Sequence, residues 1–468
     1  MSIKSAVPEP GLVGQQSFRD AIRDFRAGTD SPRDYLERKL AVIDEREPVV
    51  RAWVATNVDN ARKAADASTE RWLRQAPLSP VDGMPIGVKD LLETVDMPTQ
   101  MGCAAYDGNF PRHDNAAVWA LREAGVLVLG KTVTAELGGT HPGPTTHPLD
   151  PTRTPGGSSS GSAAVVAAGM VPAAIGTQVA GSIIRPASYC ANWALKPSQG
   201  AVNRGERQAT SMSTHGTHAA CPEDMWLLTM AMAARAGGDP GFPSLAGPMD
   251  TTPMAARPYS VGVMQTEGWN GVDAATRTAF DLVLAQLDRL GCPVLRRDNC
   301  SALDAFEDTL VGARDVALSI TAWENHWRLR GVVAANPDGV STRSKQTLRV
   351  ADELGVDGYA RLIARRSHIR LQHCALSGEA EVLISLGAPG PAPVWAGDIE
   401  GQPLAQWPTG DPVFNAPSSL LGAPVVTVPL MWVDGLPVGL QVMGQQGSDA
   451  RVTAIAQWFA DNMDPIRI

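Results

Sequence analysis

The sequence predicts an α/β protein with a large mixed β-sheet core covered by helices on both faces and a helical insert in its middle third. Two observations support this fold class. Short apolar runs at 86–88, 126–129 and 173–175 alternate with helix-like stretches at 115–124 and 160–170. This alternation is typical of βα units, whose strands are buried on both sides. Mostly helical patterns then dominate the region that follows residue 300.

The first 80 residues are expected to form a helical region. Ser31 is suited to cap a helix, because Pro32 follows it at the first helical position. A second helix is predicted over 57–75, where Ala, Arg and Glu are frequent. Pro77 and Pro80 are turn signals that end it, so the mixed core begins near residue 81.

The helical insert is predicted over 265–375. Residues 272–290 have the spacing of an amphipathic helix that leads into a short strand at 293–295. The stretches 302–330 and 341–373 are mostly helical in pattern. The middle third of the chain therefore adds a helical layer to the sheet.

The C-terminal segment is expected to complete the sheet. Strand-like runs lie at 382–386, 425–428 and 438–442, and a last helix is predicted over 450–459. We predict one domain over 1–468. Its parts are the N-terminal helical region (1–80), a core segment (81–200), the helical insert (265–375), and the sheet completion with a substrate loop (380–468).

Composition and charge exclude several classes of protein. A length of 468 residues with 44% hydrophobic residues is typical of a globular chain with a large core. The net charge is −9 and no Lys/Arg block stands out, so a nucleic-acid partner is not expected. The longest weakly polar run, 163–176, contains Gly169 and Pro172 and is too short to span a bilayer.

The cysteines and the first residues indicate the compartment. Six cysteines are scattered without C-x-x-C pairs, which favours free thiols in a reducing compartment. Residues 1–11 contain Lys4, Glu9 and two prolines and have no apolar segment of a secretory signal. We therefore expect a cytoplasmic protein.

The densest chemical signal is a run of glycines and serines at 155–162. A flexible linker is the plainest interpretation of such a run. The apolar helical stretch that follows at 163–168 argues against it, because linkers do not usually adjoin a buried segment. Glycines allow unusual backbone dihedrals, and hydroxyls at a helix start can point into a cavity. The run is therefore a candidate active-site loop, with Ser158 and Ser159 at its centre.

Two further motifs accompany this loop. Small residues precede Ser182, which lies 24 positions after Ser158, and allow a tight turn whose N–H groups converge on one point. An oxyanion requires such a nest of donors. Lys89 ends a strand-like apolar run. Taken alone it would more often be a surface cation.

Together these motifs resemble the amidase signature family, and the resemblance extends over nearly the whole chain. It is carried by Gly87 to Asp90, Gly130 to Thr132, Pro155 to Ser159, Leu195 to Pro197 and Gly435 to Gln441, together with the spacing between the two serines. The resemblance implies the amidase signature fold and a Ser-Ser-Lys triad. In that triad Ser182 is the nucleophile, Ser158 is a bridging serine with a cis peptide bond, and Lys89 is the base.

The resemblance also implies how the reaction runs. Lys89 accepts a proton through Ser158 while Ser182 attacks the carbonyl, which requires the pKa of Lys89 to fall from about 10.4 through burial. The oxyanion and substrate-binding positions are Gln178, Val179, Ala180 and Gly181, and the N–H of Ser182 assists them. No metal or organic cofactor is expected. A small-molecule substrate is the expected partner, and dimers are frequent in the family, so a homodimer is an expectation.

Three departures from the commonest family pattern concern the turn before and after Ser182. Gln178 stands where an aspartate is frequent, and Ala180 stands where a glycine is frequent. Ile184 precedes Arg185 rather than following it. The neutral Gln178 leaves any cationic partner without its charge, so the ion pair expected for Arg185 is in question. We expect the chemistry to survive these changes.

Two other interpretations compete. The sequence Gly157 to Gly161 also fits the G-x-S-x-G nucleophile elbow of serine esterases, with Ser159 as nucleophile and a later Asp and His. An elbow follows a strand, whereas 149–155 contains two prolines. The second alternative is a partner-dependent protein that resembles the A chain of the tRNA-dependent amidotransferases and releases ammonia from glutamine, or a binding protein that keeps the fold.

The substrate class is the least constrained property. The loop at 389–411 is long and rich in Pro and Gly, and such loops are often functional. Five aromatic residues are candidates to line an apolar pocket: Trp323, Trp327, Trp395, Trp407 and Phe414. Such a pocket favours small apolar or aryl amides, anilides or carbamates, the substrates of a urethanase or an aryl acylamidase. Esters are also expected to react, because a better leaving group needs less protonation.

Overall fold

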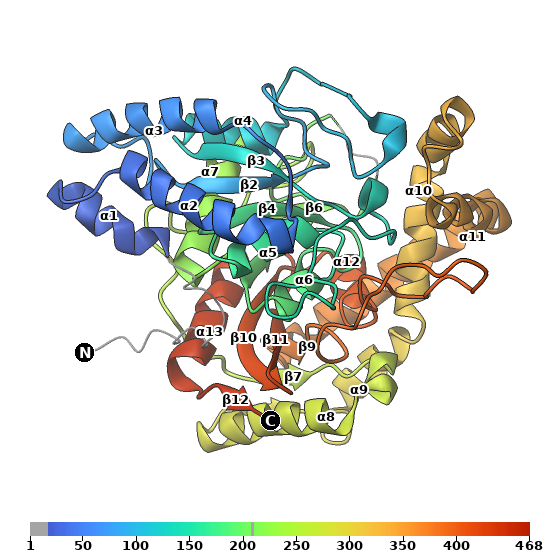
Figure 1. Cartoon of the computed structure of the whole chain (residues 1–468). Coiled ribbons are helices and arrows are strands. Elements are labelled where there is room, and N and C mark those ends of the chain that lie inside the picture. Colours follow the sequence, from blue (N-terminus) through green and yellow to red (C-terminus); the bar gives the residue numbers. More distant parts are fainter. Residues whose placement is uncertain (1–16, 207–209) are drawn as a thin grey trace.

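One mixed β-sheet organises the chain (Figure 1). The computed structural model describes residues 17–206 and 210–468, so the prediction for residues 1–11 lies outside the described residues. The described part contains a 12-stranded sheet with the order β1-β3-β2-β4-β6-β5-β10-β11-β9-β7-β8, and β12 pairs with β10. Both parallel and antiparallel pairs occur, for example β2 with β4 and β4 with β6. The predicted mixed sheet is confirmed.

The strands are β1 (Trp53–Thr56), β2 (Pro85–Lys89), β3 (Leu127–Thr132), β4 (Ala173–Gln178), β5 (Trp193–Lys196), β6 (Thr214–Ala219), β7 (Val261–Val263), β8 (Val294–Leu295), β9 (Val382–Leu386), β10 (Val425–Val433), β11 (Leu436–Met443) and β12 (Ile466–Arg467). The helices are α1 (Phe18–Ala27), α2 (Pro32–Val50), α3 (Val58–Leu73), α4 (Ala116–Glu123), α5 (Ser160–Ala167), α6 (Ile184–Tyr189), α7 (Pro222–Ala236), α8 (Ala274–Arg289), α9 (Ser301–Thr309), α10 (Ala313–Ala335), α11 (Thr342–Ala375), α12 (Ala416–Leu421) and α13 (Asp449–Asn462).

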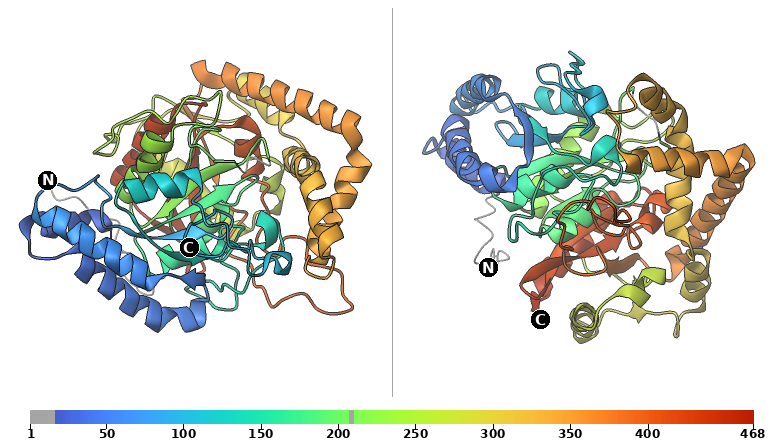
Figure 2. Two further views of the ribbon diagram at one scale, coloured as in Figure 1. Left: turned by 90° about the horizontal axis from the view of Figure 1, so that it is seen from above. Right: turned by 45° about the vertical axis from the view of Figure 1, so that its right-hand side comes forward.

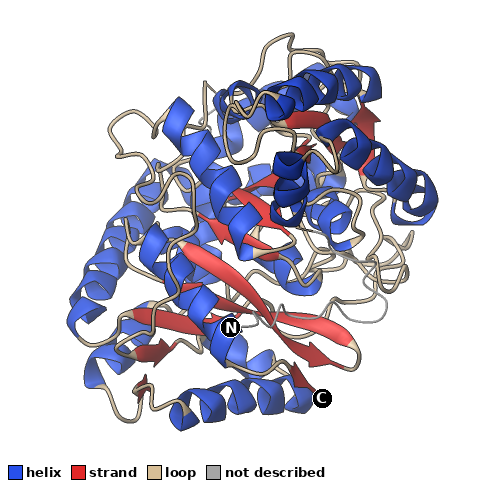
Figure 3. Ribbon diagram, turned by 90° about the vertical axis from the view of Figure 1, so that its left-hand side faces the viewer, coloured by secondary structure: helices blue, strands red, loops and turns tan. Residues whose placement is uncertain are grey.

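Helices cover both faces of the sheet, as Figure 3 shows with the strands in red between blue helices. The alternation of side chains along β3 explains why. Leu127 and Leu129 pack in one apolar cluster with Val165 of α5, whereas Val128 belongs to a second cluster with Trp226 of α7. Successive strand residues point to opposite faces, so a strand that is apolar throughout requires a helical layer on each side.

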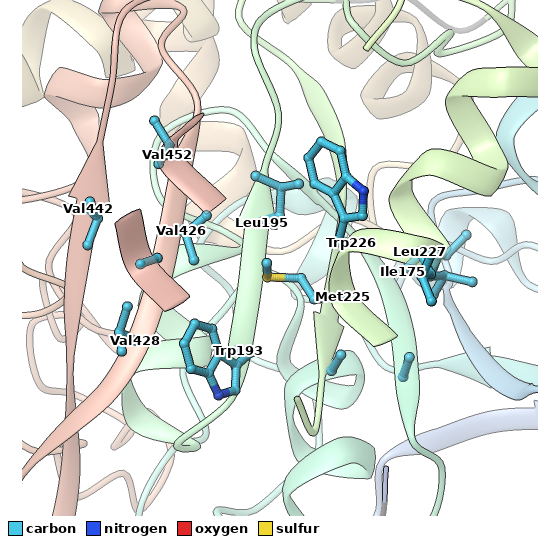
Figure 4. Packing of buried hydrophobic residues seen from close by; sticks show 14 of the residues in the cluster. Ile175, Trp193, Leu195, Met225, Trp226, Leu227, Val426, Val428, Val442 and Val452 are labelled. Atoms are coloured by element: carbon cyan, nitrogen blue, oxygen red, sulfur yellow. The ribbon is translucent and has the colours of Figure 1, made fainter. Parts of the chain in front are cut away.

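The second cluster forms the larger part of the core (Figure 4). Val426 and Val428 of β10 and Leu195 of β5 meet Trp226 of α7 and Val452 of α13 in this cluster. These contacts join strands that are more than 200 residues apart in the chain to helices that follow them. The core therefore fixes the neighbouring strands whose ends carry the candidate site.

The helical insert stands at one side of the sheet, where α10 and α11 pack together (Figure 2). The predicted stretch 302–330 is divided into α9 and α10, because Gly312 adopts φ 70° and breaks the helix between them. The helix α11 bends at Gly355, which adopts φ 61°. The insert is therefore helical as predicted, with a break that a residue-by-residue pattern does not reveal.

Several expectations about the rest of the chain can be compared with the structure. The six cysteines are free thiols, as predicted. No helix in the described ranges is long and apolar enough to cross a membrane. The loop at 389–411 has no helix or strand. The cytoplasmic location, the homodimer and the division of the chain into one domain stay predictions.

Truncation of Phe459 tests the packing of α13. Phe459 is fully buried against the sheet, so Phe459→Ala is expected to lower the free energy of unfolding by about 3–5 kcal/mol through the cavity it leaves. Urea denaturation measures this loss. The matched control is Leu73→Ala, because Leu73 is 70% exposed and its truncation should change stability by less than about 0.5 kcal/mol. Equal losses in the two variants would contradict the described packing.

Candidate active site

Lys89 lies at the carboxyl end of β2, between β3 and β4. Its side chain is fully buried, because β2 is an inner strand covered on both faces. The Lys89 Nζ lies 2.8 Å from Ser158 Oγ, 2.9 Å from Ser159 Oγ and 3.0 Å from Thr177 Oγ1. It also donates to the backbone oxygen of Thr177 at 3.2 Å. The amine is therefore surrounded by three hydroxyls and one carbonyl, with no carboxylate in its ion-pair range among the described residues.

Ser158 and Ser159 belong to the loop that leads into α5. The peptide bond between Gly157 and Ser158 is cis. The backbone oxygen of Ser158 accepts a hydrogen bond from Ala135 N at 3.0 Å, and Ser159 N donates to Ser182 O at 3.3 Å. The second bond ties the two serine motifs, which lie 24 residues apart in the sequence, to each other.

Ser182 lies in the turn at 179–182 between β4 and α6. Ser158, Val179 and Ser182 line one cavity, and Ser182 is half-buried. The backbone N–H groups of Ala180, Gly181 and Ser182 donate to no other group in the described part of the chain. Free donors on a tight turn beside a hydroxyl are what an oxyanion site requires.

Gln178 supports this turn from below. Its Oε1 accepts hydrogen bonds from Ile183 N at 2.8 Å and Ile184 N at 3.0 Å, and its Nε2 donates to Ser419 Oγ at 3.3 Å. The side chain is fully buried and does not reach the cavity. This corrects the assignment of Gln178 to the substrate-binding positions, because its polar atoms are used to hold the turn.

The cavity has a volume of about 190 Å³ and lies between the core and the insert. Its apolar walls contain Leu91, Leu92, Leu137, Leu329 and Val332. Its polar and small lining residues are Glu93, Asn115, Glu136, Gly138, Gly139, Thr177, Arg204, Thr210, Ser213, His215, Thr321, Asn325, Arg328, Ser344 and Thr347. Residues of α10 and α11 form one wall, so the insert takes part in the site.

None of the five aromatic candidates lines this cavity, which corrects the expected aromatic pocket. Trp323 stacks on His326 at 4.6 Å between ring centroids, and Trp327 is 68% exposed. Both belong to α10, but neither side chain is part of the cavity wall that this helix forms. Phe414 is fully buried in the core.

The other two aromatic candidates anchor the loop at 389–411 to the insert. Trp395 lies under the guanidinium of Arg343, which also pairs with Asp398. Trp407 lies under Arg314, which pairs with Asp411 at 2.9 Å. Each anchor therefore combines a loop tryptophan, a loop carboxylate and a helix arginine.

Burial determines the charge state of the groups around Lys89. Burial, with a smaller contribution from the positive charge of Arg185, lowers the pKa of Lys89 well below its usual value. His215 and His218 of β6 are also buried, and burial lowers the pKa of each to about 3, so both are neutral at pH 7. A lysine in such surroundings can hold a lone pair that accepts a proton.

Asp90 and Lys131 form a fully buried ion pair of 2.9 Å next to Lys89. Lys131 Nζ also donates to Thr99 Oγ1 at 2.6 Å, and Asp90 Oδ2 accepts from Gln100 N at 3.1 Å. The pair thus fixes the loop around residue 100, whose Met101 oxygen accepts a hydrogen bond from the cavity residue Leu137. Its role is to hold the cavity wall in place.

The nucleophile-elbow alternative fails on geometry. No strand precedes Ser159, since 149–155 is loop. Ser159 Oγ contacts Lys89 and donates to Thr177 O at 3.2 Å, and Ser159 does not line the cavity. A buried hydroxyl that faces a lysine is not placed to attack a substrate in this cavity.

The sequence predicts Lys89, Ser158 and Ser182 in one site, and the structure brings Lys89 to Ser158 and brings both serines to one cavity. Thr177 is part of the same motif but received no predicted role, although it makes two of the four contacts of the lysine. Its position at the end of β4, parallel to the strand that carries Lys89, is the signal that could have revealed it.

Comparisons with known proteins agree with this arrangement. A family model described as Amidase matches residues 34–453. The A-type subunit of the glutamyl-tRNA(Gln) amidotransferase of Chloroflexus aggregans is 31% identical over 467 residues, which cover 92% of this chain and 93% of that protein. A crystal structure of an amidase has a TM-score of 0.81 at 28% identity and covers 95% of this chain and 99% of that chain. A bacterial aryl acylamidase belonging to the amidase signature enzymes has a TM-score of 0.80 at 20% identity, with 96% of each chain covered, and therefore supports the fold alone.

The buried ion pair gives a stability prediction. Lys131→Met leaves Asp90 buried without its cation, which should lower the free energy of unfolding by about 3–5 kcal/mol in urea denaturation. The matched control is the double variant Asp90→Asn with Lys131→Met, which removes both charges and should recover most of this loss. A single variant as stable as the double variant would contradict the pairing.

Proposed function

The chain belongs to the amidase signature family of C–N hydrolases, and from this premise we propose that it hydrolyses small neutral amides, anilides or carbamates through an acyl-enzyme on Ser182. The observation that carries the proposal is the contact of 2.8 Å between Lys89 Nζ and Ser158 Oγ in a fully buried environment. Burial lowers the pKa of Lys89, so a neutral amine is available as a base.

The proposed reaction begins with two coupled proton transfers. Ser158 gives its proton to Lys89 and takes the proton of Ser182, whose Oγ forms a bond with the substrate carbonyl carbon. The carbonyl oxygen becomes an oxyanion that accepts hydrogen bonds from the N–H groups of the turn at 179–182. Each good donor of this kind contributes roughly a hundredfold to a thousandfold in rate.

The tetrahedral intermediate then collapses. The lysine ammonium returns its proton through Ser158 to the leaving nitrogen, the C–N bond breaks, and the amine departs. Water attacks the acyl ester on Ser182 and passes a proton along the same path. The ester bond breaks, the acid product leaves, and Lys89 is again neutral.

The cavity supports the substrate class. Leucine and valine side chains form its apolar walls, and its volume is about 190 Å³. A dry protein cavity of roughly 150 Å³ holds a benzene ring. This cavity is therefore of a size for an aryl or short alkyl group, although its walls are aliphatic and not aromatic as the sequence suggested. Esters of the same acids are expected to be cleaved as well.

A second candidate function is the release of ammonia from glutamine for a partner protein. The 31% identity to the A-type component of an amidotransferase favours it. The cavity also has Glu136 and Arg328 in its wall, and glutamine carries both an ammonium and a carboxylate. Glu136 already accepts hydrogen bonds from Ser341 N at 3.0 Å and Ser344 Oγ at 2.5 Å, so its charge is partly used within the protein. Ammonia release from glutamine by the isolated chain, without activity on anilides, would favour this candidate.

Labelling and turnover test the nucleophile. A fluorophosphonate should form an adduct on Ser182, and a chromogenic anilide or aryl carbamate should be hydrolysed without any added protein. Ser182→Ala should lower kcat/KM by about a thousandfold or more, because the covalent step is lost. The control is Ser68→Ala, a buried serine whose hydroxyl bonds Asp82 and does not line the cavity. An adduct on Ser159, or no turnover across the panel, would contradict the proposal.

The pH profile tests the base. Lys89 must be neutral to accept a proton, so kcat/KM should fall as the pH decreases through the lowered pKa of Lys89. The fall should occur well below pH 10.5, where an exposed lysine would lose its proton. Lys89→Arg keeps a positive charge but cannot release a proton at these pH values, and it should lose roughly a hundredfold to ten-thousandfold in rate without recovery at alkaline pH. A flat profile far into the acid range would remove Lys89 from this role.

A further inference from the structure

Arg185 lies three residues after Ser182 and is only 4% exposed. Its Nε donates to Thr409 O at 2.8 Å, and its Nη2 donates to Gly157 O at 2.6 Å. These partners are backbone oxygens. No carboxylate in the described ranges lies within 4.0 Å of the guanidinium, and its Nη1 has no hydrogen-bond partner there. A buried guanidinium normally faces a carboxylate, so this charge requires an explanation.

The guanidinium touches both serine motifs. It bonds the oxygen of the cis peptide that precedes Ser158. A Cβ atom placed on Gly181, next to Ser182, would lie 2.5 Å from Arg185 Nη1. The positive charge is therefore immediately below the turn whose N–H groups face the cavity. In a buried site such a charge acts strongly on nearby ionisable groups.

Two neighbouring side chains are placed to neutralise Arg185, and neither does so. Asp411 faces it electrostatically but pairs with Arg314 at 2.9 Å. Gln178 supports the same turn with a neutral side chain, and its oxygen is bonded to Ile183 N and Ile184 N. A glutamate at this position could keep both bonds and add a negative charge, so the amide supplies the structure without neutralising the arginine.

The other groups that face Lys89 leave Arg185 as the charge that matters. His215 and His218 come from β6 and are neutral at pH 7. The contacts from β4 and from the serine loop are hydroxyls and one carbonyl. Lys131, on β3, is paired with Asp90, so these two charges largely cancel. Arg185 lowers the pKa of Lys89 in addition to the effect of burial.

We propose that Arg185 is a positioning residue whose unneutralised charge keeps Lys89 in its free-base form and stabilises the negative charge that develops beside Ser182. Gln178 is the second half of this device, because its neutral amide preserves the positive charge. The inference rests on the proposed function. It extends that function by assigning the electrostatic setting of the site to a pair of residues that do not touch the substrate.

The test follows the rate at which a fluorophosphonate labels Ser182 as a function of pH, which requires no knowledge of the substrate. Gln178→Glu and Arg185→Met each reduce the net positive charge next to Lys89. Both should move the midpoint of the acid limb to higher pH by about one unit, since the lysine then holds its proton more tightly. Below the midpoint the labelling rate should fall about tenfold relative to the parent protein.

Gln178→Met is the matched control. It removes the acceptor for Ile183 N and Ile184 N without adding a charge, so it should slow labelling while the midpoint stays in place. Circular dichroism establishes that each variant is folded, and Gln178→Glu decides the outcome if Arg185→Met does not fold. An unmoved midpoint in folded Gln178→Glu, or an equal shift in Gln178→Met, overturns the inference. A parent protein that takes no label on Ser182 at any pH contradicts the proposed function instead.

Discussion

The burial of one amine at the end of an inner strand is the constraint on which the site depends. Lys89 is held by hydroxyls rather than by a carboxylate, and it is the absence of a counter-charge in the described surroundings that leaves it a base. The cost in folding free energy of burying an ionisable amine is offset by the large apolar core on both faces of the sheet. Chemistry and packing are thus coupled in this protein, because the same strand supplies both.

The sheet order explains how distant motifs converge. β2 lies between β3 and β4, and its parallel pairing with β4 places Lys89 next to Thr177 at the same edge. The loop after β3 contributes Leu137 to the cavity, and the turn after β4 contributes Ser182. Ligand sites at the carboxyl ends of parallel strands follow from this geometry. The antiparallel strand β6 adds His215 from the opposite direction.

Prediction from sequence succeeded where a pattern is local. The strand at 382–386 and the helix cap at Ser31 agree with the structure, because alternation and capping are properties of short segments. The strand β6 was missed because its Thr, His and Gly residues do not resemble a buried strand until tertiary pairing covers them. The helix α7 was missed although Cys221 and Pro222 mark its start. The proposed triad follows from resemblance, whereas the cavity wall could not be predicted, since helical spacing alone does not say which side of α10 faces the site. Trp323 and Trp327 occupy one stripe, and Thr321, Asn325 and Arg328 occupy another.

The two arginine anchors between the loop at 389–411 and the insert have a consequence for how recognition changes in evolution. Arg314 and Arg343 each bind a carboxylate and a tryptophan of the loop, while other residues of α10 and α11 line the cavity. A change in the angle of either helix therefore displaces the loop as well, and the loop in turn contacts Arg185 through Thr409. Insert and loop form one inherited unit. A new substrate preference is more easily gained by exchanging both segments together than by altering one of them in isolation.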